Sequence, residues 1–284
     1  MEITIARDAG YCFGVRDAVD LAYETSGENG EVYMLGDIVH NERVVQDLAK
    51  AGTRVVDSLD DIPDDRPVLF RAHGTAEDVW GTAKEKGLDI VDATCPLVQE
   101  IHDEVEKLEK DGRQIIIIGD HGHDEVVGIM SHAKNPLVVA TPEETHALRK
   151  MKRAGVVSQS TQTIENVQAI INILMTKVFD LHFINTICFP TKRNQEQIKE
   201  LAAKSDIMII IGSFTSANSK RLTELALGIN SKTYQVTCAD EIEPAWFDEA
   251  KKVGVSAGAS TPDYLIEEVH EKLKSLSPVT EEVF

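Results

Sequence analysis

Three cysteines in this chain share one local sequence pattern, and a thiol in that pattern is suited to binding a metal. They are Cys12 in EITIARDAGYCFGVRDAV, Cys95 in LDIVDATCPLVQEIHDEV and Cys188 in LHFINTICFPTKRNQEQI. Each segment reads as a short apolar strand, a turn, the cysteine and then apolar residues at helical spacing. A thiol at a helix N-terminus lies in the positive potential of the helix dipole, which favours the thiolate that binds metals.

The repeated position favours one shared centre for the three thiols. A single cysteine is most often a small buried apolar residue, and that interpretation stays open for each one taken alone. Neither a CxxC pair nor a CxxxCxxC triplet occurs, so a zinc knuckle and a radical S-adenosylmethionine cluster are not predicted. Three cysteine ligands fit a 4Fe–4S cluster in which one iron keeps an open position. The fourth cysteine, Cys238, lacks the pattern and is predicted to be structural.

Polar loops that follow other apolar strands carry donors suited to phosphate oxygens. The candidates are His40, His73, His123, Thr163, Ser216, Asn218 and Ser260. Imidazole, hydroxyl and amide groups beside glycines offer many hydrogen bonds without filling a cavity, which suits a diphosphate. Each residue also has a simpler interpretation, as a cap at a strand end or at a helix N-terminus.

Glu125 differs from these donors because its side chain can give up a proton. It lies in the tract DHGHDE, and burial there would raise the pKa of its carboxyl toward neutral pH. We therefore expect Glu125 to be the acid of the site. The same tract is compatible with a separate metal site, although HxH followed by acids in one loop is only weak support for one.

The elements that must position these residues alternate along the chain. Strand-like apolar runs alternate with helical patterns from end to end, which predicts an α/β fold with mainly parallel sheets. The cysteines divide the chain into three small α/β units: residues 1–94 with the N-terminal strand, residues 95–185, and residues 186–284 with the C-terminal tail. Ligands bind at the carboxyl ends of parallel strands, so three units about one axis would aim their loops at one central site.

Two further loop types recur with the units. One group comprises VLFRAHGTAEDV, IIIIGDHGHDEVV and IMIIIGSFTSANS, and the other comprises VYMLGDIVHNERVV, GVVSQSTQTIENV and GVSAGASTPDYLI. Each segment runs from an apolar strand into a polar loop that contains one or two of the candidate site residues. This repetition supports the three-fold organisation that the cysteines indicate.

The composition restricts the partners of the chain. It has 284 residues and a formal net charge of −19 at pH 7, which argues against binding nucleic acid or an anionic membrane by bulk electrostatics. Its longest apolar runs, IIII and IMIII, are far shorter than the roughly 20 residues of a membrane helix. The charged N-terminus does not read as a signal peptide. We expect a cytoplasmic protein that holds a small anionic ligand by local geometry.

The motifs together resemble the LytB/IspH family, the 4-hydroxy-3-methylbut-2-enyl diphosphate reductases of the non-mevalonate pathway of isoprene biosynthesis. The resemblance covers nearly the whole chain and is carried by AGYCFGV, GDIVHNERVV, RAHG, VDATCPLV, GHDEVVG, STQT, NTICFPT, SANS and SAGASTPD, in the family's order. It implies three α/β units in a pseudo-three-fold trefoil around a central iron–sulfur cluster. It also implies an oxidoreductase that removes the allylic hydroxyl of its substrate with two electrons and two protons, which gives isopentenyl and dimethylallyl diphosphates.

The resemblance implies a role for each candidate residue. One 4Fe–4S cluster with an open iron, which would bind the substrate hydroxyl, would be held by Cys12, Cys95 and Cys188. The diphosphate would be bound by His40, His73, Ser216, Asn218 and Ser260. His123 would orient the substrate, Glu125 would relay protons to the leaving hydroxyl, and Thr163 would position that hydroxyl. A reduced ferredoxin or flavodoxin is implied as the electron donor, and Lys192 and Arg193 beside Cys188 form a candidate basic patch for it.

The chain departs from the family pattern at Pro190, Phe214, Thr215 and Ala217, so the diphosphate pocket is expected to differ in detail. Two other functions are compatible with the residues alone. A cluster-dependent dehydratase or hydratase also handles a hydroxyl at an open iron but consumes no electrons. An iron–sulfur sensor would bind a partner and catalyse nothing, whereas the polar loops here surround a small-ligand site.

Overall fold

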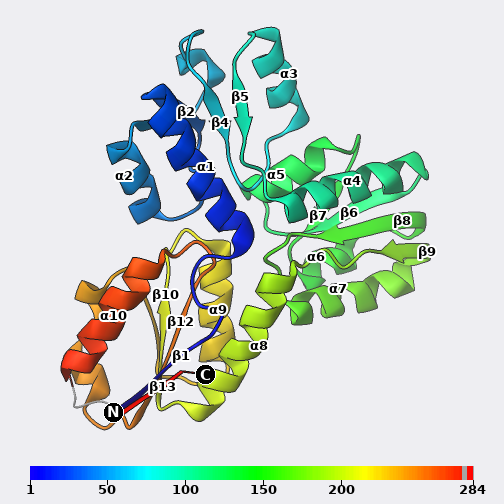
Figure 1. Cartoon of the computed structure of the whole chain (residues 1–284). Coiled ribbons are helices and arrows are strands. Elements are labelled where there is room, and N and C mark those ends of the chain that lie inside the picture. The colour runs from blue at the N-terminus through cyan, green and yellow to red at the C-terminus, as the bar shows by residue number, and fades with distance from the viewer. Residues whose placement is uncertain (277–279, 284) are drawn as a thin grey trace. The chain divides into compact units, whose positions relative to one another are not determined.

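The computed structural model describes residues 1–276 and 280–283, and these form three sheets in which every strand pair is parallel (Figure 1). The chain divides into two compact units. Unit 1 comprises Met1–Val15, His40–Val44 and Phe189–Phe284, and unit 2 comprises Arg16–Val39 and Val45–Cys188. Parallel sheets flanked by helices confirm the predicted α/β class.

Unit 1 contains one sheet with the strand order β11-β10-β12-β1-β13. Its strands are β1 (Glu2–Ile5), β10 (Ile207–Ile211), β11 (Thr233–Val236), β12 (Lys252–Ala257) and β13 (Thr280–Val283). Its helices are α8 (Phe189–Lys204), α9 (Ala217–Leu227) and α10 (Asp263–Leu276), with 3-10 turns η2 (Ala239–Glu241) and η3 (Pro244–Phe247). Helix α1 (Phe13–Asn29) begins in unit 1 and continues into unit 2, as does α2 (Glu42–Lys50).

Unit 2 contains two sheets, with the orders β3-β2-β4-β5 and β7-β6-β8-β9. The first has β2 (Val32–Leu35), β3 (Thr53–Val56), β4 (Val68–Phe70) and β5 (Ile90–Asp92), with η1 (Leu59–Asp61) and α3 (Glu77–Glu85). The second has β6 (Gln114–Ile118), β7 (Leu137–Val139), β8 (Met151–Ser158) and β9 (Val178–Phe183). Around it lie α4 (Pro96–Lys110), α5 (Asp124–Ser131), α6 (Pro142–Ala147) and α7 (Ile164–Lys177).

The continuous apolar runs form central strands because helices cover both of their faces. In β10, Ile209 packs in one cluster with residues of α10, whereas Met208 and Ile210 pack with residues of α8 and α9. In β6, Ile116 packs with α7 and Ile117 packs with α4 and α5. A strand that is buried on both faces needs no polar alternation, which explains the runs IIII and IMIII.

The three sheets share four strand positions in the same spatial order, namely second, first, third and fourth, and in the sheet of unit 1 β13 lies beyond the fourth position. The first position is taken by β2, β6 and β10, the second by β3, β7 and β11, the third by β4, β8 and β12, and the fourth by β5, β9 and β1. The N-terminal strand β1 therefore completes the sheet of the C-terminal part. Its residue Ile3 pairs with Val253 and is 1% exposed within that core.

The sequence predicts that the N-terminal strand belongs to the first unit, residues 1–94, and therefore to the sheet of β2–β5. The structure instead pairs β1 with β12 of the C-terminal sheet. A strand of four residues carries too little sequence information to indicate its partner, and the partner here comes from the other end of the chain.

The structure also changes the grouping of the recurring loops. VYMLGDIVHNERVV belongs with IIIIGDHGHDEVV and IMIIIGSFTSANS because β2, β6 and β10 share the first position, and VLFRAHGTAEDV belongs with the loops after β8 and β12.

Among residues 1–276 and 280–283, no helix combines the length and the apolar run that crossing a bilayer requires.

A buried histidine pair lies beneath the loop that follows β4. His102 of α4 is 3% exposed and stacks on His132, with the ring centroids 4.2 Å apart. A Cβ built on Gly74, whose φ is +84°, would lie 2.8 Å from the His102 ring, so glycine lets this loop approach the histidine. Burial, and next the charge of His132, lower the pKa of His102 to about 4.

We expect this pair to make stability depend on pH. Because the pKa of His102 falls from 6.5 in the unfolded chain to about 4 in the folded one, acid favours unfolding between these values. The loss over the whole window is on the order of 3 kcal/mol for this one group. Urea unfolding at pH 7 and pH 4.5 should show a smaller loss of stability in His102→Gln than in the unmodified chain. Equal losses in the two proteins would contradict the assignment.

Candidate functional site

Each of the three predicted thiols lies one residue before a helix, in the loop after a fourth-position strand. Cys12 precedes α1, Cys95 precedes α4 and Cys188 precedes α8. The strand, turn, cysteine and helix pattern is therefore present in all three sheets. In α4 the first helical residue is Pro96, whose fixed φ and missing N–H suit that position.

The main chain of each cysteine makes the same hydrogen bond. The N–H of Cys12 donates to the carbonyl of Ala259 at 3.4 Å, and the other two distances are 3.0 Å, from Cys95 to Ala72 and from Cys188 to Ser160. Each accepting carbonyl lies two residues beyond a third-position strand. The same bond therefore fixes the thiol-bearing turn against the neighbouring loop in each sheet.

The three thiols fit the ligand set of an iron–sulfur cluster. All three are half-buried, none of the four cysteines forms a disulfide, and each of the three lies at a helix N-terminus, where thiolate is favoured. Cys238 differs because it precedes only the three-residue turn η2. Its predicted structural role stays a prediction.

The loops after the first-position strands align without a gap. They read GDIVHNE from Gly36, GDHGHDE from Gly119 and GSFTSAN from Gly212. His40, His123 and Ser216 thus occupy one equivalent place in the three sheets, and Glu42, Glu125 and Asn218 occupy another. Four of the predicted site residues, namely His40, His123, Ser216 and Asn218, together with the predicted acid, therefore come from one repeated loop.

The loops after the third-position strands contain His73 and Ser260. The residue equivalent to these two in the loop after β8 is Thr161, whereas the sequence pointed to Thr163. The shared hydrogen bonds align Ala72, Ser160 and Ala259, so the next residues, His73, Thr161 and Ser260, are equivalent. Thr163 is instead the N-cap of α7, where its side chain accepts from the N–H of Asn166. The sequence alone could not reveal this register, because the aligned loops share almost no residues.

Glu125 is the predicted site residue that the structure buries most completely. It is 2% exposed, and its carboxylate accepts from the N–H of Ser160 at 2.6 Å and from the hydroxyl of Ser160 at 2.9 Å. Burial favours the protonated carboxyl, whereas the two donors favour the carboxylate. Sequence reasoning missed Ser160, whose only signal is its place in the loop SQSTQT.

His123 caps the helix that carries Glu125. Its Nδ1 accepts from the N–H of Glu125 at 3.1 Å. A neutral ring that accepts at Nδ1 carries its proton at Nε2, so His123 offers an N–H donor there. The ring of His73 lies edge-on to it, with the centroids 5.7 Å apart.

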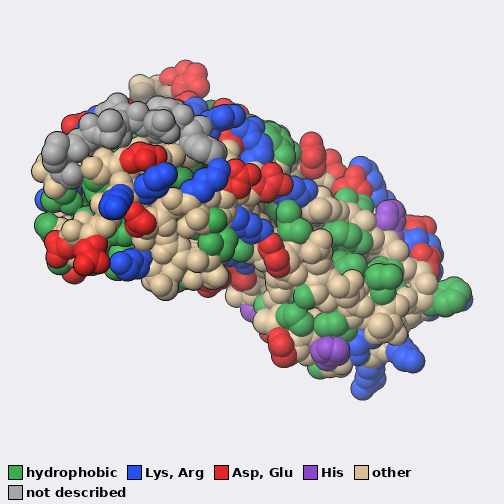
Figure 2. All heavy atoms as spheres, turned by 90° about the horizontal axis from the view of Figure 1, so that it is seen from below, with side chains coloured by type: hydrophobic (Ala, Val, Ile, Leu, Met, Phe, Trp, Pro, Cys, Tyr) green, Lys and Arg blue, Asp and Glu red, His purple; other side chains and the backbone are tan. Residues whose placement is uncertain are grey.

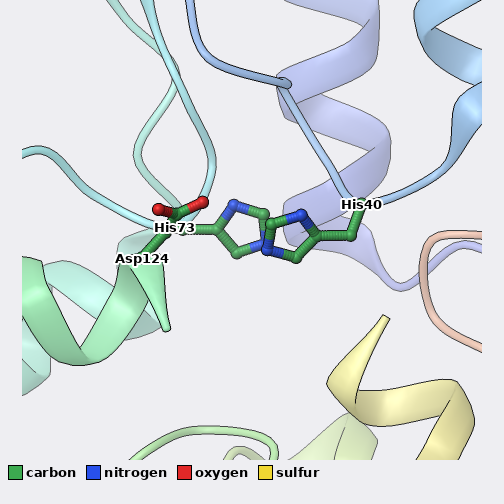
Figure 3. A group of neighbouring side chains, drawn as sticks. All are labelled: His40, His73 and Asp124. Carbon is green, nitrogen blue, oxygen red and sulfur yellow. The ribbon is translucent and has the colours of Figure 1, made fainter. Parts of the chain in front are cut away.

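His73 also lies beside a carboxylate. A ring nitrogen of His73 and a carboxylate oxygen of Asp124 are within 4.8 Å of each other, and both come from unit 2 (Figure 3). Asp124 pairs with Arg71, whose Nη1 lies 2.5 Å from Oδ2. A carboxylate and an imidazole are ligands that a cation accepts, but the guanidinium already neutralises this carboxylate.

The donors of unit 1 are held by their own loops. Ser216 caps α9 and accepts from the N–H of Ser219, and the hydroxyl of Ser260 donates to the carbonyl of His40 at 3.2 Å. Asn218 is 6% exposed, and its Nδ2 has no hydrogen-bond partner among the described residues. A buried amide N–H without a partner is costly, so it indicates a group that the site would bind.

Two aromatic rings follow two of the thiols directly. Phe13 and Phe189 stack with their centroids 5.6 Å apart and are 38% and 53% exposed. The basic patch predicted beside them is partly neutralised, because the guanidinium of Arg193 pairs with Asp8, with Nε 3.0 Å from Oδ2. On the face that Figure 2 shows, Lys and Arg side chains lie among Asp and Glu side chains.

The fold and the site define an α/β protein whose three parallel sheets each present a thiol and polar donors at the carboxyl ends of the strands. A family model described as LytB protein matches residues 3–274. The chain belongs to this LytB family.

Curated relatives and solved structures agree with this membership. The chain is 40% identical over 278 residues, 98% of each chain, to the 4-hydroxy-3-methylbut-2-enyl diphosphate reductase of Geotalea daltonii. It is also 40% identical over 275 residues, 96% of this chain and 97% of the other, to the protein of that name from Geobacter sulfurreducens.

Two solved structures resemble the chain. One, described as the reductase that is the terminal enzyme of the non-mevalonate pathway, has a TM-score of 0.72 at 37% identity and covers 96% of this chain and 99% of its own. The other, the E-1-hydroxy-2-methyl-but-2-enyl-4-diphosphate reductase of Plasmodium falciparum, has a TM-score of 0.94 at 26% identity and covers 100% and 92%.

Because Ser160 donates two hydrogen bonds to Glu125, we expect its hydroxyl to contribute to the free energy of unfolding. Ser160→Ala removes the hydroxyl donor from a buried carboxylate, and we expect it to lower the free energy of unfolding by about 1.5–3 kcal/mol. The matched control is Ser26→Ala, which removes a buried hydroxyl that donates to the neutral carbonyl of Ala22 and should cost about 1 kcal/mol. Urea unfolding at pH 7 measures both, and a double variant with Glu125→Gln should show that most of the Ser160 effect depends on Glu125. Independent, additive effects would contradict the pairing.

Proposed function

We propose that this chain is a 4-hydroxy-3-methylbut-2-enyl diphosphate reductase. It would break the allylic C–O bond of its substrate, take up two electrons and two protons, and release water with isopentenyl or dimethylallyl diphosphate. The observation that carries the proposal is the equal register of Cys12, Cys95 and Cys188 in three sheets, each held by the same main-chain hydrogen bond. Membership of the LytB family supports it.

The three thiols would hold one 4Fe–4S cluster, which when bound supplies the electrons and an open iron for the substrate hydroxyl. The chain contributes the positive ends of α1, α4 and α8, which stabilise the thiolates. It also contributes the Phe13–Phe189 stack, whose two apolar rings directly follow two of the thiols in the sequence. An iron–sulfur centre in this place accounts for a half-buried thiol at each equivalent turn.

The diphosphate would be bound by the repeated donors. His40, Ser216, Asn218 and Ser260 belong to unit 1, and His73 belongs to unit 2. The buried amide of Asn218, which lacks a partner among the described residues, supports a ligand with several acceptor oxygens. These hydroxyl, amide and imidazole donors would bind an anion in a chain of net charge −19 without a large basic patch.

The proton for the leaving hydroxyl would come from Glu125. Ser160 holds the carboxyl group through two hydrogen bonds, one to each oxygen, and after Glu125 has given its proton the same two donors would stabilise the carboxylate that remains. Thr163 would position the leaving hydroxyl, because the cap of α7 uses only its oxygen as an acceptor and its O–H remains a donor. His123 would donate from Nε2 to the substrate, since its Nδ1 is engaged with the main chain of α5.

The electron donor would be a small redox protein, a reduced ferredoxin or flavodoxin. Its contact surface would include the exposed Phe13 and Phe189 and the half-buried Lys192, three residues after Phe189 in α8. Arg193 contributes less charge than the sequence suggests, because Asp8 neutralises it.

Turnover under anaerobic conditions tests the proposed function. The chain, reconstituted with iron and sulfide, should consume electrons from dithionite through a viologen mediator and convert 4-hydroxy-3-methylbut-2-enyl diphosphate to the two isoprenoid diphosphates. We expect Glu125→Gln to lower kcat at least 100-fold, since one positioned proton donor contributes about 10²–10⁴ in rate. A fully loaded protein that oxidises no viologen would contradict the reductase and favour a hydratase.

Metal content tests the proposed ligands separately from turnover. Cys95→Ser should lose most of the iron and the visible absorption of the reconstituted protein, because a hydroxyl is a poor ligand for iron–sulfur clusters. Cys238→Ser is the matched control and should retain both. Loss of iron in Cys238→Ser but not in Cys95→Ser would contradict the ligand assignment.

A further inference from the structure

An acidic side chain lies where the proposed function needs an anion to bind. Asp124 comes within 4.8 Å of His73, a residue proposed to bind the diphosphate (Figure 3). The side chain of Asp124 is 28% exposed, so water screens its charge only in part. A carboxylate at this distance would repel a diphosphate and so weaken binding unless another group offsets it.

Arg71 is that group. Its Nη1 lies 2.5 Å from Oδ2 of Asp124, and its side chain is 25% exposed. Arg71 and His73 are two residues apart in the loop after β4, whereas Asp124 starts α5. The ion pair thus places a positive charge on the same loop as the phosphate-binding histidine.

The guanidinium of Arg71 also packs against the turn after β2. A Cβ built on Gly36 would lie 2.7 Å from Nη1 and 3.1 Å from Cζ of Arg71. Gly36 has a φ of +73°, so the turn after β2 relies on glycine both for its backbone conformation and for this close approach. A guanidinium packed against a turn keeps one position, which a flexible surface arginine does not.

We propose that Arg71 is a positioning residue that neutralises Asp124 and thereby lets His73 bind the diphosphate. This inference rests on the proposed function. The Arg71–Asp124 ion pair links the loop after β4 to α5. Under this inference it also compensates charge at the anion site.

Charge removal and charge restoration distinguish this role from a structural one. In Arg71→Gln the carboxylate of Asp124 loses the positive charge of the guanidinium, so we expect KM for the substrate to rise about tenfold while kcat changes less than twofold. Arg71→Lys keeps the charge and should recover most of the affinity. Adding Asp124→Asn to Arg71→Gln removes the repelling charge and should restore KM to within about threefold. A purely structural ion pair predicts the opposite, since the double variant also lacks it.

A second measurement does not depend on the stability of Arg71→Gln. Asp124→Asn alone leaves the guanidinium without its counter-charge, so inorganic diphosphate should bind the reconstituted protein about three- to tenfold more tightly in calorimetry. Arg54→Gln is the matched control, because it breaks an exposed ion pair to Glu31 in the same unit and should change neither KM nor diphosphate affinity. Unchanged or weaker diphosphate binding in Asp124→Asn would overturn the inference.

The two proposals fail in different ways. If the unmodified protein turns over the substrate and His73→Ala weakens diphosphate binding, but the Arg71 and Asp124 variants do not change it, only the inference is wrong. If the loaded protein neither turns over the substrate nor binds inorganic diphosphate, the proposed function itself is wrong.

Discussion

One hydrogen bond, made three times, determines the geometry on which the rest of the site depends. In each sheet the N–H of a cysteine donates to the carbonyl two residues beyond the third-position strand. This bond joins the turn before a helix to the neighbouring strand-end loop, so the helix begins directly after the thiol each time. Because parallel strands present their carboxyl ends at one edge of a sheet, the donors of the first- and third-position loops lie at the edge where the thiol lies.

The parts of this arrangement that depend on local sequence are predictable. The cysteine turns are recognised from short segments, since an apolar strand, Pro96 and the helical spacing after each thiol are local signals. The buried strands β6 and β10 are likewise evident as continuous apolar runs. The presence of three parallel sheets follows from these signals, although the assignment of β1 to the C-terminal sheet does not.

The parts that depend on pairing across the chain are not predictable from one sequence. Ser160 is separated by 35 residues from Glu125, and Arg71 by 53 residues from Asp124. Neither pair shares a motif. The polar motif STQT suggests Thr163 as a site residue, and the structure adds that its oxygen caps α7. A hydroxyl in such a loop can cap a helix with its oxygen and still donate its proton to a ligand, and the capping role becomes visible only in the register of the folded loop.

The repeat also makes the three thiols unequal in how their positions are secured. Cys95 and Cys188 are placed by strands that are close to them in sequence, β4 with β5 and β8 with β9. Cys12 follows β1, which pairs with β12 and whose turn is fixed by Ala259, nearly the full length of the chain away. The position of Cys12 therefore depends on a contact between the two ends of the chain, and the loop that this contact closes has the largest entropy cost of the three. Under the proposed function, the third ligand of the cluster is therefore in place only when the C-terminal sheet has formed, which couples loading of the metal to completion of the fold.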